Sequence, residues 1–241
     1  MSKAAIVSGA ATGIGLAVAE RLLDDGFAVA LVDADAEALA EAEEMLTGEE
    51  ALFLLADVSD EEEVGEAFDQ AADALGPLHA LVNCAGLRRE VLFEHTSAEL
   101  FRQLLEVNLV GTLIASQAAL DRMGDELAIV NLSSASGLRA NAGHAAYGAS
   151  KAGVKLLSES MAVELASRGV RVNCIAPGPG DGASPQLSAA WRDTSPQRRL
   201  IQPREVANAV AWLLSAEASG VTGHTIAIDG GFAIAGMART D

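Results

Sequence analysis

Short apolar segments alternate with longer amphipathic segments along almost the whole chain of 241 residues. The short segments, which are β-branched or otherwise apolar, lie at 4–8, 28–32, 52–56, 79–82, 127–132, 170–175 and 225–228. The amphipathic segments lie near 14–25, 35–46, 60–75, 97–123, 145–167 and 203–215. Strands that are apolar throughout and alternate with helices are typical of a parallel sheet covered on both faces. The pattern therefore predicts one α/β domain over residues 1–241, built on a doubly wound sheet of seven parallel strands.

The expected helices have recognisable starts, and one segment has no periodicity. The start signals are the capping-box pairs Ser59 with Glu62 and Thr96 with Glu99, and Pro203 in the first turn of the last long helix. Residues 177–202 contain four of the six prolines and follow neither the helical nor the strand period. Because irregular segments of this length often lie beside a site, we expect a substrate-side lid there.

Composition narrows the class of partner. Residues 1–76 hold 19 of the 34 acidic residues and only 2 of the 16 basic ones, so this part of the chain is strongly negative. Such a charge argues against nucleic acid or an anionic membrane as a partner. No apolar run approaches the ~18 residues of a membrane span, and no secretory leader is evident. We therefore expect a cytoplasmic protein that acts on a small molecule.

The cysteines and histidines give no sign of a disulfide or a metal centre. Cys84 and Cys174 each end an apolar run, so we expect both to be reduced, buried and structural. His79, His95 and His224 are scattered through the chain without the spacing of metal ligands.

A glycine-rich turn joins the first predicted strand to the first predicted helix. It runs from Ser8 to Gly15 with the sequence SGAATGIG. Its glycines permit a tight turn, and the helix that follows offers N–H groups and a favourable field to a pyrophosphate. The spacing differs from the commoner Gly-x-Gly-x-x-Gly, and a turn of this kind can also serve packing alone. The expected dinucleotide contacts are Gly9, Thr12, Gly13, Ile14 and Gly15.

Asp33 follows the second predicted strand, about twenty residues beyond the glycine turn, where a carboxylate can bind an adenosine ribose. The same carboxylate repels a 2′-phosphate, and no Arg or Lys occupies 8–15 or 33–36 to receive one. We therefore predict NAD rather than NADP as the cofactor. The competing interpretation is that Asp33 only caps the helix near residue 35.

The only tyrosine of the chain, Tyr147, lies four residues before Lys151, and Ser134 ends an apolar stretch upstream. Residues four apart share one face of a helix, so the phenol and the ammonium can point into one pocket. A free tyrosine has a pKa of roughly 10, and a nearby cation lowers that pKa toward neutrality. With a serine hydroxyl to hold a substrate oxygen, the set suits proton transfer to or from an alcohol or carbonyl. Alone, a Tyr-x-x-x-Lys pair can also arise by chance on a helix.

Together these features resemble the short-chain dehydrogenase/reductase family, specifically its short single-domain branch, over residues 4–232. Further matching motifs are Asp57-Val58, Asn83-Cys84-Ala85-Gly86, Asn108, Pro177-Gly178 and Asp229-Gly230-Gly231. The resemblance implies a Rossmann-type fold, a nicotinamide cofactor and a homotetramer. The Ala- and Leu-rich stretches 97–123 and 145–167 would suit a subunit interface, although core packing within one chain explains them equally.

The resemblance also implies a role for each member of a catalytic tetrad. Tyr147 would be the general acid/base, Lys151 would lower its pKa and bind the nicotinamide ribose, and Ser134 would orient the substrate oxygen. Asn108 would hold a water that links Lys151 to solvent. The implied cofactor contacts beyond the glycine turn are Asp33, Asp57, Val58, Asn83, Ala85, Gly86, Tyr147, Lys151, Pro177 and Gly178.

The chain departs from the family pattern after Pro177-Gly178. The family has a branched residue and then a threonine that contacts the nicotinamide carboxamide and phosphate, whereas this chain continues PGDGAS as far as Ser184. Either Ser184 takes over that contact, or the contact is lost and the affinity for the cofactor falls.

The candidate substrate contacts are Arg88 and Arg89, which follow the Asn-Cys-Ala-Gly motif, and Arg139 and His144, which lie between Ser134 and Tyr147. They would suit a small carboxylated or polyhydroxylated secondary alcohol, unless the arginines are only surface charges. Two other functions share most of these motifs. One is an NADP-linked 3-oxoacyl ketoreductase, and the other is a nucleotide-binding scaffold that performs no chemistry.

Overall fold

Seven parallel strands form one sheet, in the order β3-β2-β1-β4-β5-β6-β7. The computed structural model describes residues 2–180 and 191–235. The strands are β1 (Lys3–Ser8), β2 (Phe27–Asp33), β3 (Ala51–Leu55), β4 (Leu78–Asn83), β5 (Met123–Leu132), β6 (Val170–Pro177) and β7 (Thr225–Ile228). Each predicted apolar segment forms one of these strands, and the predicted doubly wound α/β fold is confirmed.

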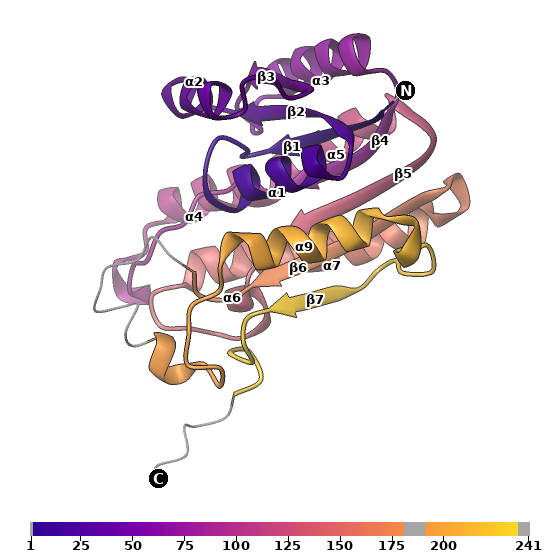
Figure 1. Cartoon of the computed structure of the whole chain (residues 1–241). Helices are drawn as coiled ribbons and strands as arrows, with labels where there is room; N and C mark the ends of the chain where they lie inside the picture. The colour runs from indigo at the N-terminus through magenta and orange to yellow at the C-terminus, as the bar shows by residue number, and fades with distance from the viewer. Residues whose placement is uncertain (1, 181–190, 236–241) are drawn as a thin grey trace.

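Helices cover both faces of the sheet (Figure 1). They are α1 (Gly13–Asp24), α2 (Ala36–Met45), α3 (Glu61–Leu75), α4 (Ala98–Leu105), α5 (Gly111–Leu120), α6 (Ala135–Leu138), α7 (Ala145–Leu165) and α9 (Pro203–Leu214), with short 3₁₀ helices η1 (Phe93–His95), η3 (Ala166–Arg168) and η4 (Ala216–Ala218). Apolar side chains of α1, α2 and α9 form one core cluster with the sheet, and those of α3, α5 and α7 form a second on the opposite face.

The segment predicted as one helix at 97–123 is several elements. α4 leads into a π-helical turn, η2 (Glu106–Val110), which continues into α5. The end of the predicted segment belongs to β5, which begins at Met123. The π turn carries Asn108 into hydrogen bonds with Leu87 in the loop after β4 and with Ser150 on α7. The hydrophobic periodicity of a helix does not depend on such a contact, so the pattern predicted an unbroken helix.

Both predicted capping boxes are wrong by one residue. The N-cap residues are Asp60 and Ser97, whose side chains accept hydrogen bonds from N–H groups in the first turn of α3 and α4. Ser59 donates its hydroxyl to a carboxylate instead, and Thr96 donates to main-chain carbonyl oxygens. The residue that follows each of them already caps the helix. Pro203 lies in the first turn of α9 as predicted.

The start of α9 is tied to the chain before it. Gln202 and Glu205 form a capping box, and two guanidinium nitrogens of Arg199 each lie 2.6 Å from a carboxylate oxygen of Glu205. The hydrogen bonds from Arg199 lower the pKa of Glu205 to about 2. These contacts anchor the described end of the 177–202 segment to the fold.

The strand order reverses between β1 and β4, which are neighbours in the sheet although β2 and β3 come between them in sequence. Ligands of open α/β sheets bind at the carboxyl ends of the strands at such a point. The turns after β1, β4 and β5 meet at this edge.

In the part of the chain that the structure describes, no helix is both long and apolar enough to cross a bilayer. The same residues contain no group of three or more His, Cys, Asp or Glu side chains that could hold a metal ion.

Candidate active site

A cavity of about 820 Å³ opens at the carboxyl ends of the strands. This volume lies at the upper end of the range for small-molecule sites. The glycine turn and Asp33 line one side of the strand reversal, and Ser134, Tyr147 and Lys151 line the other. All the predicted site residues line this cavity except Asn83, Arg89, Asn108 and Arg139.

The glycine turn is packed too closely for side chains at two of its positions. A Cβ atom on Gly15 would lie 1.9 Å from the carbonyl oxygen of Gly9, and one on Gly9 would lie 2.5 Å from Cα of Ala85. Gly13 differs, because its φ is +59° and a Cβ there would meet no atom within 4 Å. The N-terminus of α1 therefore opens on the cavity, where its N–H groups and positive field suit a phosphate.

The carboxylate of Asp33 is held by main-chain N–H groups on two sides. Its Oδ2 accepts from Ala11 at 3.0 Å, and its Oδ1 accepts from Asp35 at 3.1 Å. Asp35, not Asp33, is the N-cap residue of α2. The interpretation of Asp33 as a helix cap is therefore wrong, and its carboxylate faces the cavity.

Asp57 and Val58 line the same side of the cavity as Asp33. The carboxylate of Asp57 accepts from the N–H group and the hydroxyl of Ser59, at 2.9 and 2.7 Å. Val58 packs against Gly111, where an added Cβ would lie only 2.8 Å from its Cγ2. The first residue of α5 thus fixes the position of one wall of the cavity.

Lys151 lies one turn after Tyr147 on α7, and its ammonium is buried. Its Nζ donates to the carbonyl oxygen of Leu132 at 2.8 Å. Burial lowers the pKa of Lys151 to about 8. Lys151 therefore presents a charge whose position α7 and the end of β5 fix together.

Tyr147 and Ser134 form a hydrogen-bonded pair beside it. Burial raises the pKa of Tyr147, while the hydrogen bond with Ser134 and the charge of Arg88 act in the opposite direction. This net direction is opposite to the predicted lowering by Lys151, because the loss of hydration of the phenolate outweighs the nearby charges. Ser134 also caps α6, a short helix that the sequence pattern did not predict, by accepting from the N–H group of Ser136 at 3.1 Å.

Asn108 lies behind the cavity wall and is fully buried. Its Oδ1 accepts from the N–H group of Leu87 at 2.7 Å, and its Nδ2 donates to the Leu87 carbonyl oxygen and to Ser150 Oγ at 3.0 and 2.9 Å. A Cβ on Gly86 would lie 2.9 Å from Asn108 Oδ1 and 3.1 Å from Lys151 Nζ. Asn108 therefore fixes the loop after β4 against Lys151, and its predicted hold on a water stays a prediction.

Two residues of the Asn-Cys-Ala-Gly motif differ from expectation. Asn83, predicted to contact the cofactor, is buried in the sheet and donates to Asn131 Oδ1 and Ser116 Oγ at 2.8 and 3.1 Å. Its NH₂ group belongs to a polar network beneath the cavity, while its Oδ1 has no partner among the described residues. Cys84, predicted to be buried and structural, is only half-buried and lines the cavity, whereas Cys174 is buried as predicted.

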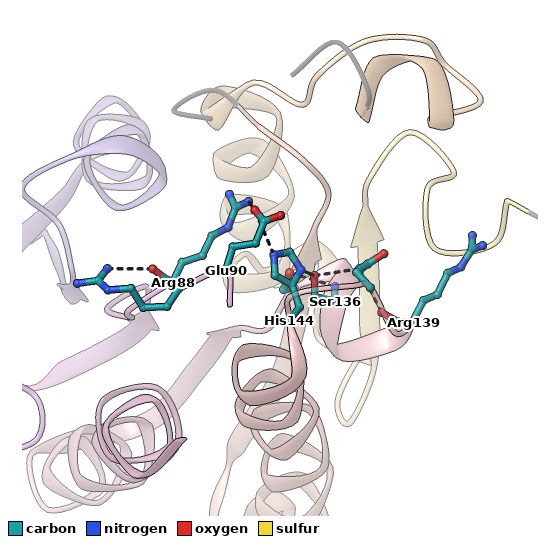
Figure 2. Close-up of polar contacts among 8 residues, drawn as sticks. Arg88, Glu90, Ser136, Arg139 and His144 are labelled. Carbon is teal, nitrogen blue, oxygen red and sulfur yellow. Dashed lines mark hydrogen bonds and ion pairs between the residues drawn. The ribbon is translucent and has the colours of Figure 1, made fainter. Parts of the chain in front are cut away.

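Of the four predicted substrate contacts, the structure brings only Arg88 and His144 into the cavity wall. Arg89 donates to the carbonyl oxygen of Arg88 and does not line the cavity. Arg139 donates to the carbonyl oxygens of Phe232 and Ala235, and Figure 2 shows it pointing away from His144. Its guanidinium holds the C-terminal turn, so neither Arg89 nor Arg139 lies in the cavity wall, where a predicted substrate contact would be expected.

The predicted lid contributes residues at both of its described ends. Pro177, Gly178, Pro179 and Gly180 line the cavity, and Trp191 lines it from the far side of the gap. The candidate replacement Ser184 lies outside the described residues. Sequence reasoning missed Trp191, and the one signal for it was an aromatic residue within an otherwise aperiodic segment.

Comparison with known proteins gives a consistent family assignment. The family model described as enoyl-(acyl carrier protein) reductase matches residues 9–233. The carbonyl reductase family member 4 of Danio rerio is 38% identical over 234 residues, which cover 96% of this chain and 98% of that protein. The cis-4-hydroxycyclohexanecarboxylate dehydrogenase of Sinomonas cyclohexanicum is 38% identical over 244 residues, with 95% and 96% covered.

A solved structure has the same fold over nearly the whole chain. A single-residue variant of the actinorhodin polyketide ketoreductase, solved with NADPH, superposes with a TM-score of 0.91 at 29% identity. The match covers 96% of this chain and 97% of that one.

Proposed function

Because the chain belongs to the short-chain dehydrogenase/reductase family, we propose that it transfers hydride between NAD and a small secondary alcohol or the corresponding ketone. We propose that this substrate is carboxylated or polyhydroxylated. Its class as an oxidoreductase that acts on carbonyls or alcohols with a nicotinamide cofactor follows from the family. The observation that carries the finer proposal is the division of one cavity. Asp33 and the open N-terminus of α1 lie on one side of the strand reversal, and Ser134, Tyr147 and Lys151 lie on the other.

The residues present fit a dinucleotide. Gly13 leaves the N-terminus of α1 open for a pyrophosphate, and the Asp33 carboxylate can still accept from ribose hydroxyls, since each oxygen uses only one of its lone pairs. A bound nicotinamide would supply the hydride acceptor for oxidation of an alcohol and the hydride donor for reduction of a ketone. The protein itself must then transfer the proton of the alcohol hydroxyl group and orient the oxygen of the alcohol or ketone.

Tyr147 is the group that carries the proton. Because its pKa is raised, it holds the proton at neutral pH and can donate it to a carbonyl oxygen during reduction. In oxidation the phenolate takes the proton from the alcohol. Ser134, already hydrogen-bonded to the phenol, holds the same substrate oxygen, and the charge of Arg88 favours the phenolate. Lys151 would add its charge to the same side of the cavity.

NAD is favoured over NADP by the charges around Asp33. Among the described residues that line the cavity, the only Arg and Lys are Arg88 and Lys151, and both belong to the catalytic side. A 2′-phosphate beside Asp33 would therefore meet a carboxylate and no cation.

Two alternatives have specific support. The ketoreductase solved with NADPH favours an NADP-linked reductase of acyl or polyketide carbonyls. The unusual PGPGDG segment after β6 favours a scaffold that binds a nucleotide without turnover. Asp33 argues against the first, and the assembled Ser134, Tyr147 and Lys151 argue against the second.

The protein is also proposed to form a homotetramer, as the family resemblance implies. Leu156 and Val163 on α7 are 62% and 84% exposed, and Leu113 on α5 is 38% exposed. Apolar side chains in such exposed positions are typical of an interface. A stable monomer in sedimentation at micromolar concentration would contradict this.

The test is a titration with NAD⁺, NADH, NADP⁺ and NADPH, followed by turnover of 4-hydroxycyclohexanecarboxylate and of polyols with wild type and Tyr147→Phe. The proposal expects tighter binding of NAD(H), measurable oxidation, and a loss of roughly 10²–10⁴-fold in kcat for the variant with cofactor binding retained. Preference for NADPH would favour the ketoreductase, and no turnover with retained binding would favour the scaffold.

A further inference from the structure

Arg88 and His144, which line the catalytic side of the cavity, both point toward Glu90 (Figure 2). The same carboxylate oxygen of Glu90, Oε2, lies 3.9 Å from Arg88 Nη2 and 3.9 Å from His144 Nε2. Both distances are too long for hydrogen bonds. A guanidinium and an imidazole thus point toward a position where the protein's own carboxylate lies without satisfying either of them.

His144 is nine-tenths buried, with 9% of its surface exposed, and its Nε2 has no hydrogen-bond partner among the described residues. Its Nδ1 lies 2.9 Å from Ser136 Oγ, which in turn accepts from Asn141 Nδ2 at 3.1 Å. The hydroxyl proton of Ser136 is therefore available to Nδ1, which leaves the ring proton on Nε2. Burial lowers the pKa of His144 and keeps the ring neutral. A buried N–H group without an acceptor is costly, so this atom is suited to an acceptor on a ligand.

Arg88 is oriented by a contact from a distant part of the chain. Its guanidinium carbon lies 4.6 Å from the ring centroid of Trp191, close enough for a cation–π contact. Arg88 and Trp191 both line the cavity, whereas Glu90 does not. The positive charge of Arg88 shifts the pKa values of both Tyr147 and His144, so it acts on the catalytic side of the cavity.

We propose that Arg88 and His144 together bind a carboxylate of the substrate, at the position that Glu90 Oε2 marks. The inference rests on the proposed function and deepens it, because it names a hydroxy acid or its oxo acid as the substrate class. The His144 ring packs edge-on against Tyr147, with centroids 5.6 Å apart. The proposed carboxylate site therefore includes a ring that is in contact with Tyr147. Glu90 competes for the same two donors and weakens the binding of anions.

The first test compares 4-hydroxycyclohexanecarboxylate with its methyl ester as substrates. Arg88→Met should raise KM for the acid by roughly 10- to 100-fold, the size expected for a lost charge-assisted contact, and change KM for the ester by less than about threefold. Arg89→Met is the matched control, because Arg89 is adjacent in sequence but does not line the cavity. His144→Leu should have the same selective effect, and His144→Gln, which keeps an N–H donor, should restore part of it. Equal changes for acid and ester would overturn the proposal.

Glu90→Gln gives a result that a purely structural role does not predict. Removing the competing carboxylate should lower KM for the acid and leave KM for the ester unchanged. A higher KM for the acid in this variant would contradict the assignment of Glu90 as a competitor.

A binding measurement separates this inference from the proposed function. Cyclohexanecarboxylate carries the anion but no hydroxyl group, so it binds without turnover. In a Trp212→Phe background, the fluorescence of Trp191 should change on titration with this acid, with NADH present or not, and Arg88→Met should weaken the binding roughly tenfold or more. If no alcohol is oxidised but this response is seen, the subsite stands and the proposed function fails. If alcohols are oxidised but the carboxylate does not bind, the subsite is refuted.

Discussion

Lys151 Nζ and the carbonyl oxygen of Leu132 lie 2.8 Å apart, so the last residue of β5 holds the ammonium of α7. Only 4% of the surface of Lys151 is exposed. The charge is therefore oriented before any ligand binds, but it is largely removed from water. Burial accordingly lowers the pKa of Lys151 from 10.5 to about 8.

The first prediction concerns the stability of Lys151→Met. Between pH values of about 8 and 10.5 the unfolded chain binds a proton at Lys151 that the folded chain does not, so wild-type stability from this group rises with pH. At pH 7 the burial of the charge costs about 3 kcal/mol by its pKa shift, offset by about 1 kcal/mol from the hydrogen bond to Leu132. The variant should therefore be about 1–3 kcal/mol more stable than wild type at pH 7, and this advantage should shrink toward pH 10.

Urea unfolding at pH 7, 9 and 10 measures the effect. Lys155→Met is the control, because Lys155 lies on the same helix but its side chain is 36% exposed and paired with Glu159. A difference between wild type and Lys151→Met that stayed constant with pH would contradict the buried charge.

The second prediction uses the fact that Tyr147 is the only tyrosine. The midpoint of the tyrosinate absorbance titration of the protein without cofactor should lie above that of a free tyrosine, because burial raises the pKa of Tyr147. Ser134→Ala should move the titration to higher pH, since the Ser134 hydrogen bond favours the phenolate. Subtracting the spectrum of Tyr147→Phe removes the tryptophan signal, and circular dichroism at each pH checks that the fold persists. A midpoint at or below that of a free tyrosine, roughly 10, would refute the raised pKa.

The strands and most of the cavity wall could be predicted because their signals are local in the sequence. Each apolar run forms a strand. A single strand or helix also positions each of the local cavity features, which are the glycine turn, Asp33 and the Tyr147–Lys151 pair. The π turn at Asn108 depends instead on Leu87 and Ser150, which lie on other elements, and no periodicity of the helix itself contains that information.

The substrate side was predictable only in part, for a related reason. Arg88 and Arg89 are chemically identical neighbours in the sequence, and what distinguishes them is the contact of Arg88 with Trp191, about a hundred residues away. Arg139 likewise belongs to the C-terminal turn through the carbonyl oxygens of Phe232 and Ala235. Long-range partners of this kind can be identified only once the fold is known.

The third prediction separates the two tasks of Asp33. In Asp33→Ala the N–H groups of Ala11 and Asp35 both lose their acceptor, which should cost about 1–2 kcal/mol of stability. Asp33→Asn keeps an acceptor but removes the charge, so it should bind NADP⁺ roughly tenfold more tightly with a smaller loss of stability. Asp35→Asn is the control, since asparagine caps helices as well as aspartate and Asp35 does not line the cavity. Calorimetric titration with NAD⁺ and NADP⁺ measures the preference, and an unchanged ratio in Asp33→Asn would remove the argument for NAD.

The fourth prediction contrasts two helical glycines. A Cβ on Gly65, within α3, would meet no atom within 4 Å, so Gly65→Ala should raise stability by about 0.5–1 kcal/mol through the lower entropy of the unfolded chain. A Cβ on Gly111, the first residue of α5, would lie 2.8 Å from Val58 Cγ2 and 3.1 Å from the Val58 carbonyl oxygen. Gly111→Ala should therefore destabilise the fold by about 1–3 kcal/mol. Because Val58 lines the cavity beside Asp57, displacing it should also weaken NAD⁺ binding, whereas Gly65→Ala should leave that binding unchanged. Urea midpoints and NAD⁺ titrations of both variants test this, and parallel shifts in the two would show that close packing against Val58 does not position this wall.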